Sequence, residues 1–344
     1  MSGAFSNTKL PRFSKEIMTV NIQKVAVLTS GGDSPGMNAC IRAVVRSGIY
    51  YGFEMWGVVR GYDGLIKGDF KKMDLRSVSN IINRGGTILK SARSDEFRTA
   101  AGMEKGFQQL KERGIDALVV IGGDGSFKGA YHFSEKYDIV VMGLPGTIDN
   151  DLYGTDYTIG YDTATNTVVE CIDKIRDTAD AHNRLFFIEV MGRDAGYIAL
   201  NAGIAAGCED ILIPETKTSI DELVKNLKRG RANRKTSGLV IVAEGDEEGG
   251  AYEVARKVKE QFDGYEMKVT VLGHIQRGGS PSCFDRVLAS RLGVAAIEGL
   301  RNGESRVMAG LINNQVVYTP LTQAAKFHSE IDTDLYRISK ILSI

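Results

Sequence analysis

Short runs of apolar residues, rich in valine and isoleucine, recur along the chain and alternate with segments of helical periodicity. Such runs are typical of parallel strands that are buried on both faces of a sheet. We predict strands at residues 25–29, 54–59, 117–121, 139–144, 185–190, 211–214 and 238–243. We predict helices at residues 37–51, 102–113, 162–178, 220–229 and 254–262. The alternation predicts an α/β fold with parallel sheets flanked by helices.

Length and composition are those of an ordinary globular protein. The 344 residues, of which 43% are hydrophobic and 25% charged, predict two lobes, with a boundary near Thr155 to Tyr161. The 43 basic and 43 acidic residues cancel, so bulk charge indicates neither nucleic acid nor a membrane as partner.

The cysteines and the N-terminal segment indicate a cytoplasmic protein. Four single cysteines without CxxC spacing, Cys40, Cys171, Cys208 and Cys283, argue against a zinc site or a disulfide framework. Residues 1–21 lack the apolar core of a signal peptide, and no run of about 18 apolar residues occurs. We interpret residues 1–21 as an N-terminal extension.

Glycines gather directly after predicted strands, where ligands bind at the carboxyl edge of a parallel sheet. The segment TSGGDSPGMN at residues 29–38 exposes backbone N–H groups at the start of a helix, which suits a phosphate. A tight turn that needs glycine only for its dihedral angles is the alternative. A second loop, GGDGS at residues 122–126, places Asp124 where it could bind Mg²⁺ or simply cap a helix. Neither loop matches GxxxxGK[ST] or GxGxxG, which argues against a Walker-type NTPase and a Rossmann dehydrogenase.

Two aspartates follow the strand at residues 139–144, in the sequence PGTIDND. Asp149 and Asp151 are two residues apart, so in an extended chain their carboxylates point the same way. One could accept a hydroxyl proton while the other helps to hold a metal, as transfer of a phosphoryl group to an alcohol requires. Ordinary turn chemistry explains the same residues.

Arginines accompany several of these glycine motifs, at Arg93, Arg184, Arg193 and Arg277. A guanidinium fork matches phosphate oxygens, although a single arginine is more often a solvated surface residue. His274, one of four histidines, lies in GHIQRGG next to the last of these arginines.

In combination and in this order, the motifs TSGGDSPGMNA, INRGGT, SAR, GGDGS, PGTIDND, EVMGR, GCE and GHIQRGG resemble those of the bacterial-type ATP-dependent phosphofructokinase family. The resemblance runs from about Lys24 to at least Asn314. It implies two similar lobes with the active site in the cleft between them. Residues 22–159 with about 275–325 would bind ATP, and residues 160–274 with about 326–344 would bind fructose 6-phosphate.

The resemblance also implies roles for individual residues. Asp149 would be the general base on the sugar 1-hydroxyl beside Thr147, with Arg93 and Arg193 steadying the transferring phosphoryl group. Asp124 and Asp151 would serve the Mg²⁺ ion that accompanies ATP. The ATP site would comprise Gly32, Arg93, Ser94, Gly123, Asp124, Gly125 and Ser126. The sugar site would comprise Thr147, Ile148, Asp149, Met191, Gly192, Arg193, Glu244, His274, Ile275, Gln276 and Arg277, with Arg184 and Lys268 donated by a neighbouring subunit of a homotetramer.

The choice of phosphoryl donor can be argued from two glycines. Pyrophosphate-using relatives carry an aspartate after GGD and a lysine before TIDND, whereas this chain has Gly125 and Gly146. A glycine at 125 leaves room for the α-phosphate and ribose of a nucleotide, so ATP is favoured. The alternatives are a pyrophosphate-dependent enzyme and a catalytically silent regulatory subunit of the same fold. Tagatose 6-phosphate and sedoheptulose 7-phosphate stay open as secondary acceptors.

An effector site for ADP or phosphoenolpyruvate is a further implication of the resemblance. The matching residues are Arg42, Arg46, Arg176, Gly207, Cys208, Glu209, Arg234 and Lys235. One wall of this effector site differs from the family, because Leu75-Arg76 stands where well-studied bacterial members carry Arg-Tyr. The sugar site differs as well, because Lys268 stands in place of an arginine. For residues 231–235, a solvated basic turn is the alternative.

Overall fold

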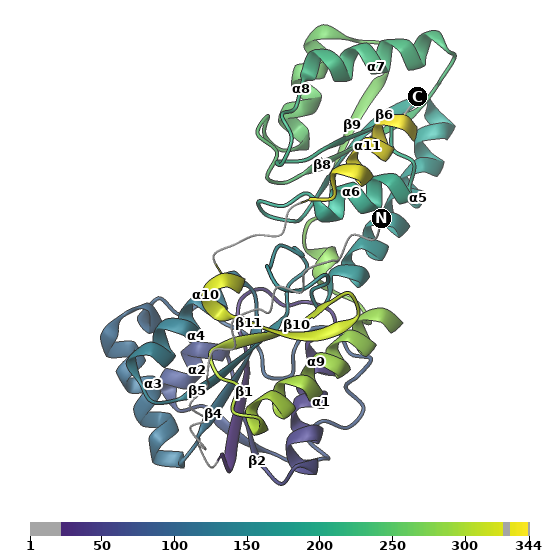
Figure 1. Ribbon diagram of the computed structural model, residues 1–344. Helices are drawn as coiled ribbons and strands as arrows, with labels where there is room; N and C mark the ends of the chain where they lie inside the picture. Colours follow the sequence, from purple (N-terminus) through teal and green to yellow (C-terminus); the bar gives the residue numbers. More distant parts are fainter. Residues whose placement is uncertain (1–21, 326–330, 343–344) are drawn as a thin grey trace, which may run out of the picture.

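The computed structural model describes residues 22–325 and 331–342, and the interpretation of residues 1–21 as an extension lies outside that part. The described residues form two lobes, each built on one β-sheet with helices on both faces (Figure 1). This arrangement confirms the α/β class that the alternation of apolar runs and helical segments predicts. In the described part of the chain, no helix combines the length and the apolar character needed to cross a membrane.

The first lobe holds a seven-stranded sheet in the order β11-β10-β5-β4-β1-β2-β3. The five inner strands are parallel, and the two edge strands β3 and β11 are antiparallel to their neighbours. The strands are β1 (Lys24–Thr29), β2 (Glu54–Val58), β3 (Phe70–Met73), β4 (Ala117–Gly122), β5 (Val140–Pro145), β10 (Val307–Ile312) and β11 (Gln315–Pro320).

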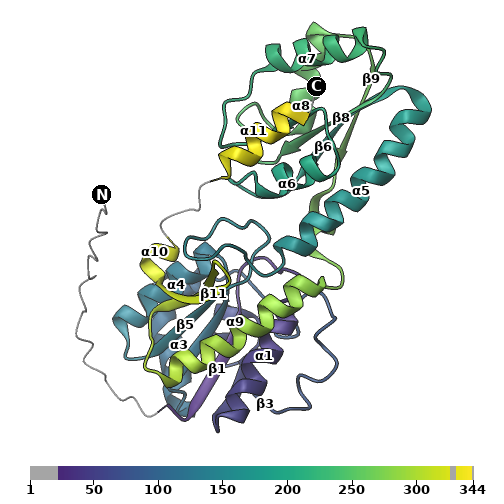
Figure 2. The same ribbon diagram turned by 45° about the vertical axis from the view of Figure 1, so that its right-hand side comes forward.

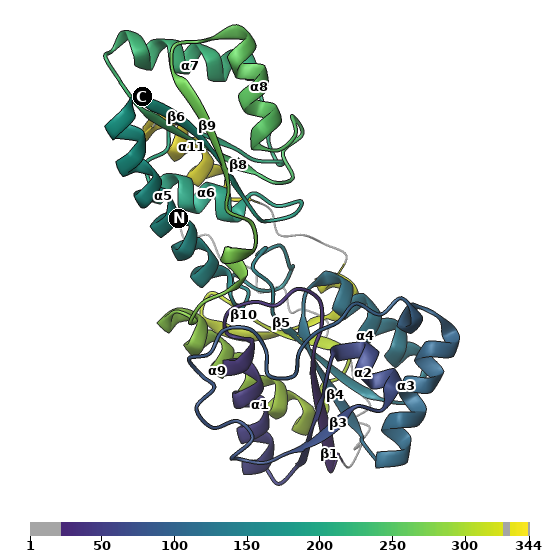
Figure 3. The same ribbon diagram turned by 180° about the vertical axis from the view of Figure 1, so that it is seen from behind.

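Helices cover both faces of this sheet, as Figure 3 shows. On one face lie α1 (Met37–Tyr50) and α9 (Cys283–Arg301), and their apolar sides share a core with β1 and β4. On the other face lie α2 (Gly61–Lys67), α3 (Ala100–Arg113), α4 (Asp124–Lys136) and α10 (Leu321–Ala324). Every residue of β4 is buried as a result, which explains why its sequence is a continuous apolar run.

The second lobe holds a smaller parallel sheet in the order β7-β8-β6-β9. Its strands are β6 (Arg184–Val190), β7 (Asp210–Leu212), β8 (Gly238–Ala243) and β9 (Glu266–Val271). One core lies between the sheet and α5 (Tyr161–His182), α6 (Tyr197–Ala205) and α11 (Thr333–Leu342). A second core lies under α7 (Ile220–Ala232) and α8 (Ala251–Gln261).

The N-terminal ends of α5 and α9 meet between the two lobes (Figure 2), and a buried carboxylate bonds them there. Asp285, in the first turn of α9, is completely buried. Its Oδ1 accepts a hydrogen bond from the Gly160 N–H at 2.8 Å, and its Oδ2 accepts one from the Thr163 N–H at 2.8 Å. The Asp285 side chain therefore satisfies the free N–H groups that open α5. The lobes are held together at this point by a helix cap that crosses between them.

We expect the Asp285→Ala variant to unfold more easily than the wild type. The substitution leaves the buried N–H groups of Gly160 and Thr163 without an acceptor, and each such group costs about 1–3 kcal/mol. The free energy of unfolding should fall by roughly 2–6 kcal/mol in urea denaturation. Ser290→Ala, which removes a hydroxyl bonded within α9, is the matched control and should change it by under about 1 kcal/mol. Equal losses in the two variants would contradict the role given to Asp285.

Candidate active site

A cleft of about 880 Å³ is lined by loops from both lobes. The loops that follow β1, β4 and β5 supply its first wall, since the carboxyl ends of these parallel strands share one edge of the sheet. The second lobe contributes Met191 and Arg193, which follow β6. His274 and Arg277 come from a short 3₁₀ segment, η2 (Gly273–Arg277), between β9 and α9.

The glycine-rich loops that follow β1 and β4 lie side by side in the first wall of the cleft. A Cβ at Gly122 would lie 2.6 Å from both the Ser126 Oγ and the Ser30 carbonyl oxygen, so only glycine allows the two loops to approach so closely. In the loop after β1, Gly31 has φ +87°, a conformation that favours glycine. Gly32, Gly123, Asp124, Gly125 and Ser126 all line the cleft, and α4 begins at Asp124 with its free N–H groups at this edge. Arg93 and Ser94 lie in the same cleft.

Asp149 and Asp151 both line the cleft, but the segment between them is not extended. Asn150 has φ +54°, and its Oδ1 accepts a hydrogen bond from the Thr158 N–H at 2.8 Å. Of the two alternatives left open by the sequence, the extended segment is therefore wrong and the turn is correct. A tight turn, held by the Asn150 side chain, presents the two carboxylates instead. The Thr147 Oγ1 accepts a hydrogen bond from the Asp149 N–H at 3.2 Å and stabilises this turn.

The carboxyl group of Asp149 is poised for proton transfer near neutral pH. Burial raises the pKa of Asp149 to about 6, and the negative charge of Asp151 adds to the rise, while Arg277 opposes it. The Asp149 Oδ1 is buried and has no hydrogen-bond partner within residues 22–325 and 331–342. A carboxylate with such a pKa can take a proton from a reacting hydroxyl.

The residues around Asp124 suit a divalent cation. The Asp124 Oδ2 accepts a hydrogen bond from the Lys128 Nζ at 2.7 Å, whereas Oδ1 is buried without a partner among the described residues. No group of three or more His, Cys, Asp or Glu side chains could hold a metal in the part of the chain that the structure describes. This donor set fits Mg²⁺, which binds through one or two carboxylates together with the phosphates of a substrate.

Positive charge enters the cleft from several segments. Arg93 and Arg193 are exposed there, and the Arg277 Nη1 donates a hydrogen bond to the Asp33 carbonyl oxygen at 3.2 Å. A Cβ at Gly32 would lie 2.5 Å from the Arg277 Nη1, so the guanidinium rests directly on the first glycine-rich loop. Arg277 thus connects the two walls of the cleft.

Other predicted residues of the sugar site lie behind the cleft wall or beside it. Ile148 is fully buried in the core of the second lobe, and Ile275 is exposed. The Gln276 Oε1 accepts a hydrogen bond from the Met191 N–H at 3.1 Å, and the Glu244 Oε1 accepts one from the Gly192 N–H at 3.3 Å. These contacts support the cleft through the backbone of residues 191–193.

The sequence did not indicate every residue of the cleft. Tyr62, Asp95, Phe97 and Arg98 also line it, and the Tyr62 hydroxyl donates a hydrogen bond to the Ser126 carbonyl oxygen at 2.7 Å. Phe97 and Arg98 belong to a 3₁₀ turn of three residues, η1 (Glu96–Arg98), which is too short to show a periodic pattern. Only the position of Arg98 shortly after the SAR motif at residues 91–93 could have indicated from the sequence that Arg98 lines the cleft.

Arg184 and Lys268 lie outside the cleft of their own chain. Arg184 begins β6 and Met191 follows its end, so the two are separated by roughly 20 Å of strand. The Arg184 Nε lies 2.9 Å from the Glu266 Oε2, and the Lys268 Nζ lies 2.7 Å from the Glu266 Oε1. These contacts lower the pKa of Glu266 to about 2, with the Arg184 hydrogen bond as the largest cause. The donation of Arg184 and Lys268 to a neighbouring subunit stays a prediction.

The predicted effector residues fall into two groups. In the second lobe, the Arg176 Nη2 donates a hydrogen bond to the Gly207 carbonyl oxygen at 3.2 Å, and the Lys235 Nζ lies 3.6 Å from the Glu209 Oε1. Cys208 lies between Gly207 and Glu209, and Arg234 precedes Lys235. Arg42 and Arg46 lie on α1 of the first lobe. The effector site stays a prediction.

Comparison with known sequences identifies the family. The family whose profile matches residues 24–300 is described as Phosphofructokinase. A protein named ATP-dependent 6-phosphofructokinase from Cytophaga hutchinsonii is 56% identical over 322 residues, which cover 94% of this chain and 98% of that relative. One of the same name from Halalkalibacterium halodurans is 54% identical over 323 residues, covering 94% and 100%. The chain belongs to the phosphofructokinase family, as its motifs predict.

Solved structures show the same fold. Phosphofructokinase from Saccharomyces cerevisiae matches with a TM-score of 0.85 at 38% identity, over 94% of this chain and 48% of that one, so this chain spans about half of the yeast chain. A pyrophosphate-dependent phosphofructokinase from Marinobacter aquaeolei matches with a TM-score of 0.80 at 23% identity, over 91% of this chain and 86% of that one. The second likeness shows the fold alone.

We expect the Asp124→Asn variant to bind divalent cations at least about tenfold more weakly, a change equivalent to about 1.4 kcal/mol. The substitution removes the charge of the buried carboxylate whose Oδ1 has no partner among the described residues. The affinity for Mn²⁺ in the presence of ADP would be measured by electron paramagnetic resonance. Asp95→Asn, at a side chain of the same cleft that is 94% exposed, is the matched control and should leave the affinity unchanged.

Proposed function

We propose that this chain transfers the γ-phosphoryl group of MgATP to the 1-hydroxyl of fructose 6-phosphate, giving fructose 1,6-bisphosphate and ADP. The observation that carries the proposal is the presence in one cleft of Asp149, with its pKa raised to about 6, together with Asp124 and Arg193. The names of the bacterial relatives that match nearly the full chain support the same activity.

The residues of the cleft divide the reaction between them. Asp149 accepts the proton of the sugar 1-hydroxyl while the hydroxyl oxygen attacks the γ-phosphorus. The hydrogen bond from the Asp149 N–H to the Thr147 side chain stabilises the turn that carries Asp149. Arg93 and Arg193 offset the negative charge on the transferring phosphoryl group. Asp124, together with Asp151 in the same cleft, would hold Mg²⁺, which when bound neutralises charge developing on the phosphate oxygens. Positioning and electrostatics therefore do most of the catalytic work.

The surroundings of Gly125 and Gly146 favour ATP over pyrophosphate as the phosphoryl donor. A Cβ at Gly125 would meet no atom within 4 Å, so the space beside it is open to a nucleotide. A Cβ at Gly146 would lie 2.9 Å from the Ile121 Cγ2 and 3.2 Å from the Met37 Cε, so a longer side chain would disturb the packing there. Both observations support ATP as the donor. The silent-subunit alternative is disfavoured because Asp124, Asp149, Arg93 and Arg193 all line the cleft.

A coupled assay of fructose 1,6-bisphosphate formation, with MgATP and Mg-pyrophosphate tested separately, should show turnover with ATP alone. In the Gly125→Asp variant the KM for MgATP should rise at least about tenfold, because like charges brought together cost several kcal/mol. Gly125→Asn, of the same shape without the charge, is the matched control. If the wild type turned over with pyrophosphate alone, the conclusion that Gly125 and Gly146 favour ATP would be wrong. No turnover with either donor would favour the catalytically silent subunit.

The rate should depend on pH through Asp149. Because the base acts when ionised, kcat/KM for fructose 6-phosphate should be level above pH 7 and fall about tenfold per pH unit below a pKa of about 6. The sugar phosphate also titrates near pH 6. The Asp149→Ser variant separates the two effects, because it keeps the substrate titration and lacks the base. It should lose about two to four orders of magnitude in kcat. An unchanged acid limb in this variant would assign that limb to the substrate.

Several finer features belong to the same proposal. A homotetramer would complete each sugar site with Arg184 and Lys268 from a neighbour, and ADP or phosphoenolpyruvate would act at the residues around Glu209. Lysine keeps the charge of the family's arginine but loses its bidentate fork, which would weaken sugar binding. Tagatose 6-phosphate and sedoheptulose 7-phosphate stay open as secondary acceptors, since selectivity between such sugars depends on about 1–3 kcal/mol.

A further inference from the structure

The turn that carries Arg193 into the cleft has an unusual backbone. Gly192 has φ +149° and Arg193 has φ +57°, a left-handed conformation that residues other than glycine rarely adopt. Such a conformation persists only where the surrounding structure imposes it. The direction of the Arg193 side chain therefore depends on whatever holds this turn.

Two neighbouring residues after β8 hold it. The Glu244 Oε1 accepts hydrogen bonds from the Gly192 N–H at 3.3 Å and from the Arg193 N–H at 2.7 Å. A Cβ at Gly245 would lie 2.1 Å from the Arg193 carbonyl oxygen, so the backbone of Gly245 packs directly against that of Arg193. The Glu244 carboxylate accepts hydrogen bonds from two N–H groups of the turn, and the tight packing of Gly245 prevents the Arg193 backbone from moving toward Gly245. The turn is thus clamped by residues 244–245.

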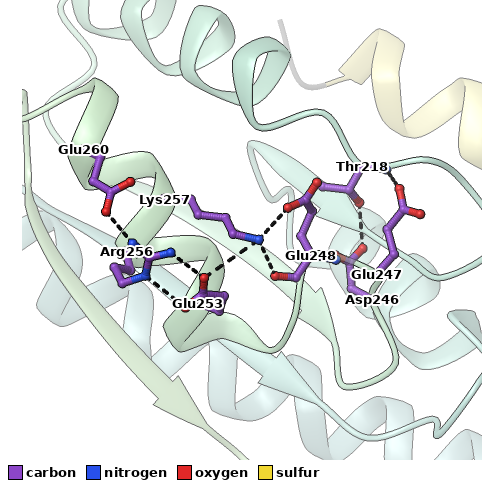
Figure 4. Close-up of polar contacts among 8 residues, drawn as sticks. All are labelled: Thr218, Asp246, Glu247, Glu248, Glu253, Arg256, Lys257 and Glu260. Atoms are coloured by element: carbon purple, nitrogen blue, oxygen red, sulfur yellow. Dashed lines mark hydrogen bonds and ion pairs between the residues drawn. The ribbon is translucent and has the colours of Figure 1, made fainter.

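The loop that contains this clamp, residues 244–250, would be mobile on its composition alone, because its sequence EGDEEGG is rich in glycine and like charges. A buried aspartate fixes it. Asp246 is 5% exposed, and its Oδ2 accepts a hydrogen bond from the Thr218 Oγ1 at 2.6 Å. Its Oδ1 accepts one from the Glu248 N–H at 3.0 Å. Figure 4 shows the Asp246 side chain pointing from the loop to Thr218, which precedes α7.

A lysine of α8 fixes the far side of the same loop. The Lys257 Nζ donates hydrogen bonds to the Glu248 carbonyl oxygen at 2.9 Å and to the Glu248 Oε2 at 2.7 Å (Figure 4). The ion pairs of Arg256 with Glu253 and Glu260 lie on the same helix but on its exposed side. The Glu247 Oε1 of the loop also accepts a hydrogen bond from the Thr218 N–H at 3.1 Å (Figure 4). Thr218 and Lys257 therefore hold the loop from its two sides.

We propose that Thr218, Asp246 and Lys257 are positioning residues for the phosphoryl transfer, acting through Glu244 and Gly245 to aim Arg193 into the cleft. The inference rests on the proposed function. Loosening of the loop frees Glu244 from the Gly192 and Arg193 N–H groups, and the left-handed turn then relaxes. A displacement of about 1 Å at a catalytic group can cost a factor of about 100 in rate.

The test begins with Thr218→Val, which removes the hydroxyl and keeps the shape of the side chain. Its kcat/KM for fructose 6-phosphate should fall by about 10- to 100-fold. The dissociation constant of MgATP without the sugar should stay within about twofold, since no ATP-site residue is disturbed. Thr218→Ser keeps the hydroxyl and should restore the rate. Arg256→Gln, which removes only the exposed ion pairs of α8, is the matched control and should leave the rate unchanged.

A double-mutant cycle then separates positioning from general destabilisation. If Thr218 acts through Arg193, Thr218→Val should cost less than about twofold in an Arg193→Gln background. Additive losses would overturn the proposal. Gly245→Ala displaces the turn while leaving the Thr218–Asp246 hydrogen bond in place, and it should reproduce the loss of rate. This second variant keeps the proposal testable where Thr218→Val fails to fold.

Amide hydrogen exchange gives a readout that does not depend on turnover. The Gly192 and Arg193 N–H groups should exchange faster in Thr218→Val than in the wild type, measured by mass spectrometry on a peptide covering residues 190–195. Unchanged exchange would contradict the proposal. A wild type that fails to phosphorylate fructose 6-phosphate would refute the proposed function instead, so the two failures can be told apart.

Discussion

The cap that the Asp285 carboxylate places on α5 is the interaction on which the arrangement of the cleft depends. Helix α5 leads into the second lobe, whereas α9 belongs to the first. From the first turn of α9, the buried Asp285 side chain accepts hydrogen bonds from the N–H groups at the start of α5. Burial raises the pKa of Asp285, so this position is costly for a carboxylate and is offset only by its hydrogen bonds. Because the catalytic loops of the two lobes must meet within hydrogen-bond reach, a fixed joint serves the site as directly as any residue inside it.

Burial also determines the chemistry within the cleft. Burial in the cleft wall raises the pKa of Asp149 to about 6, and the charge of Asp151 adds to the effect. At Asp124 the Oδ2 accepts a hydrogen bond from Lys128, while the buried Oδ1 has no partner among the described residues. The two carboxylates are thereby suited to different tasks, and the difference arises from their neighbours rather than from their residue type.

How far the sequence predicts this structure depends on whether a pattern is local. Fully buried strands such as β4 and β8 are found because every residue in them is apolar. The strands β3, β9, β10 and β11 were not predicted. β9, at a sheet edge, mixes charged with apolar residues and is only partly buried, whereas β10 was missed although its run is apolar. The sequence left the turn at Asn150 undecided, because its left-handed backbone depends on Thr158, eight residues further along. The glycine motifs and aspartates of the cleft were found by composition and order, whereas their distances and the pKa of Asp149 needed the fold.

The backbone of Arg193 shows why some functional contacts escape sequence reasoning altogether. A left-handed arginine is costly, and the structure offsets that cost with a carboxylate from another strand end, at Glu244, and with a glycine that allows close approach, at Gly245. The resemblance implied only a sugar-binding role for Glu244, and Asp246 belongs to none of the motifs. A residue can therefore contribute to catalysis by fixing the main chain of another, and its signature is a strained dihedral angle beside a buried acceptor rather than a motif.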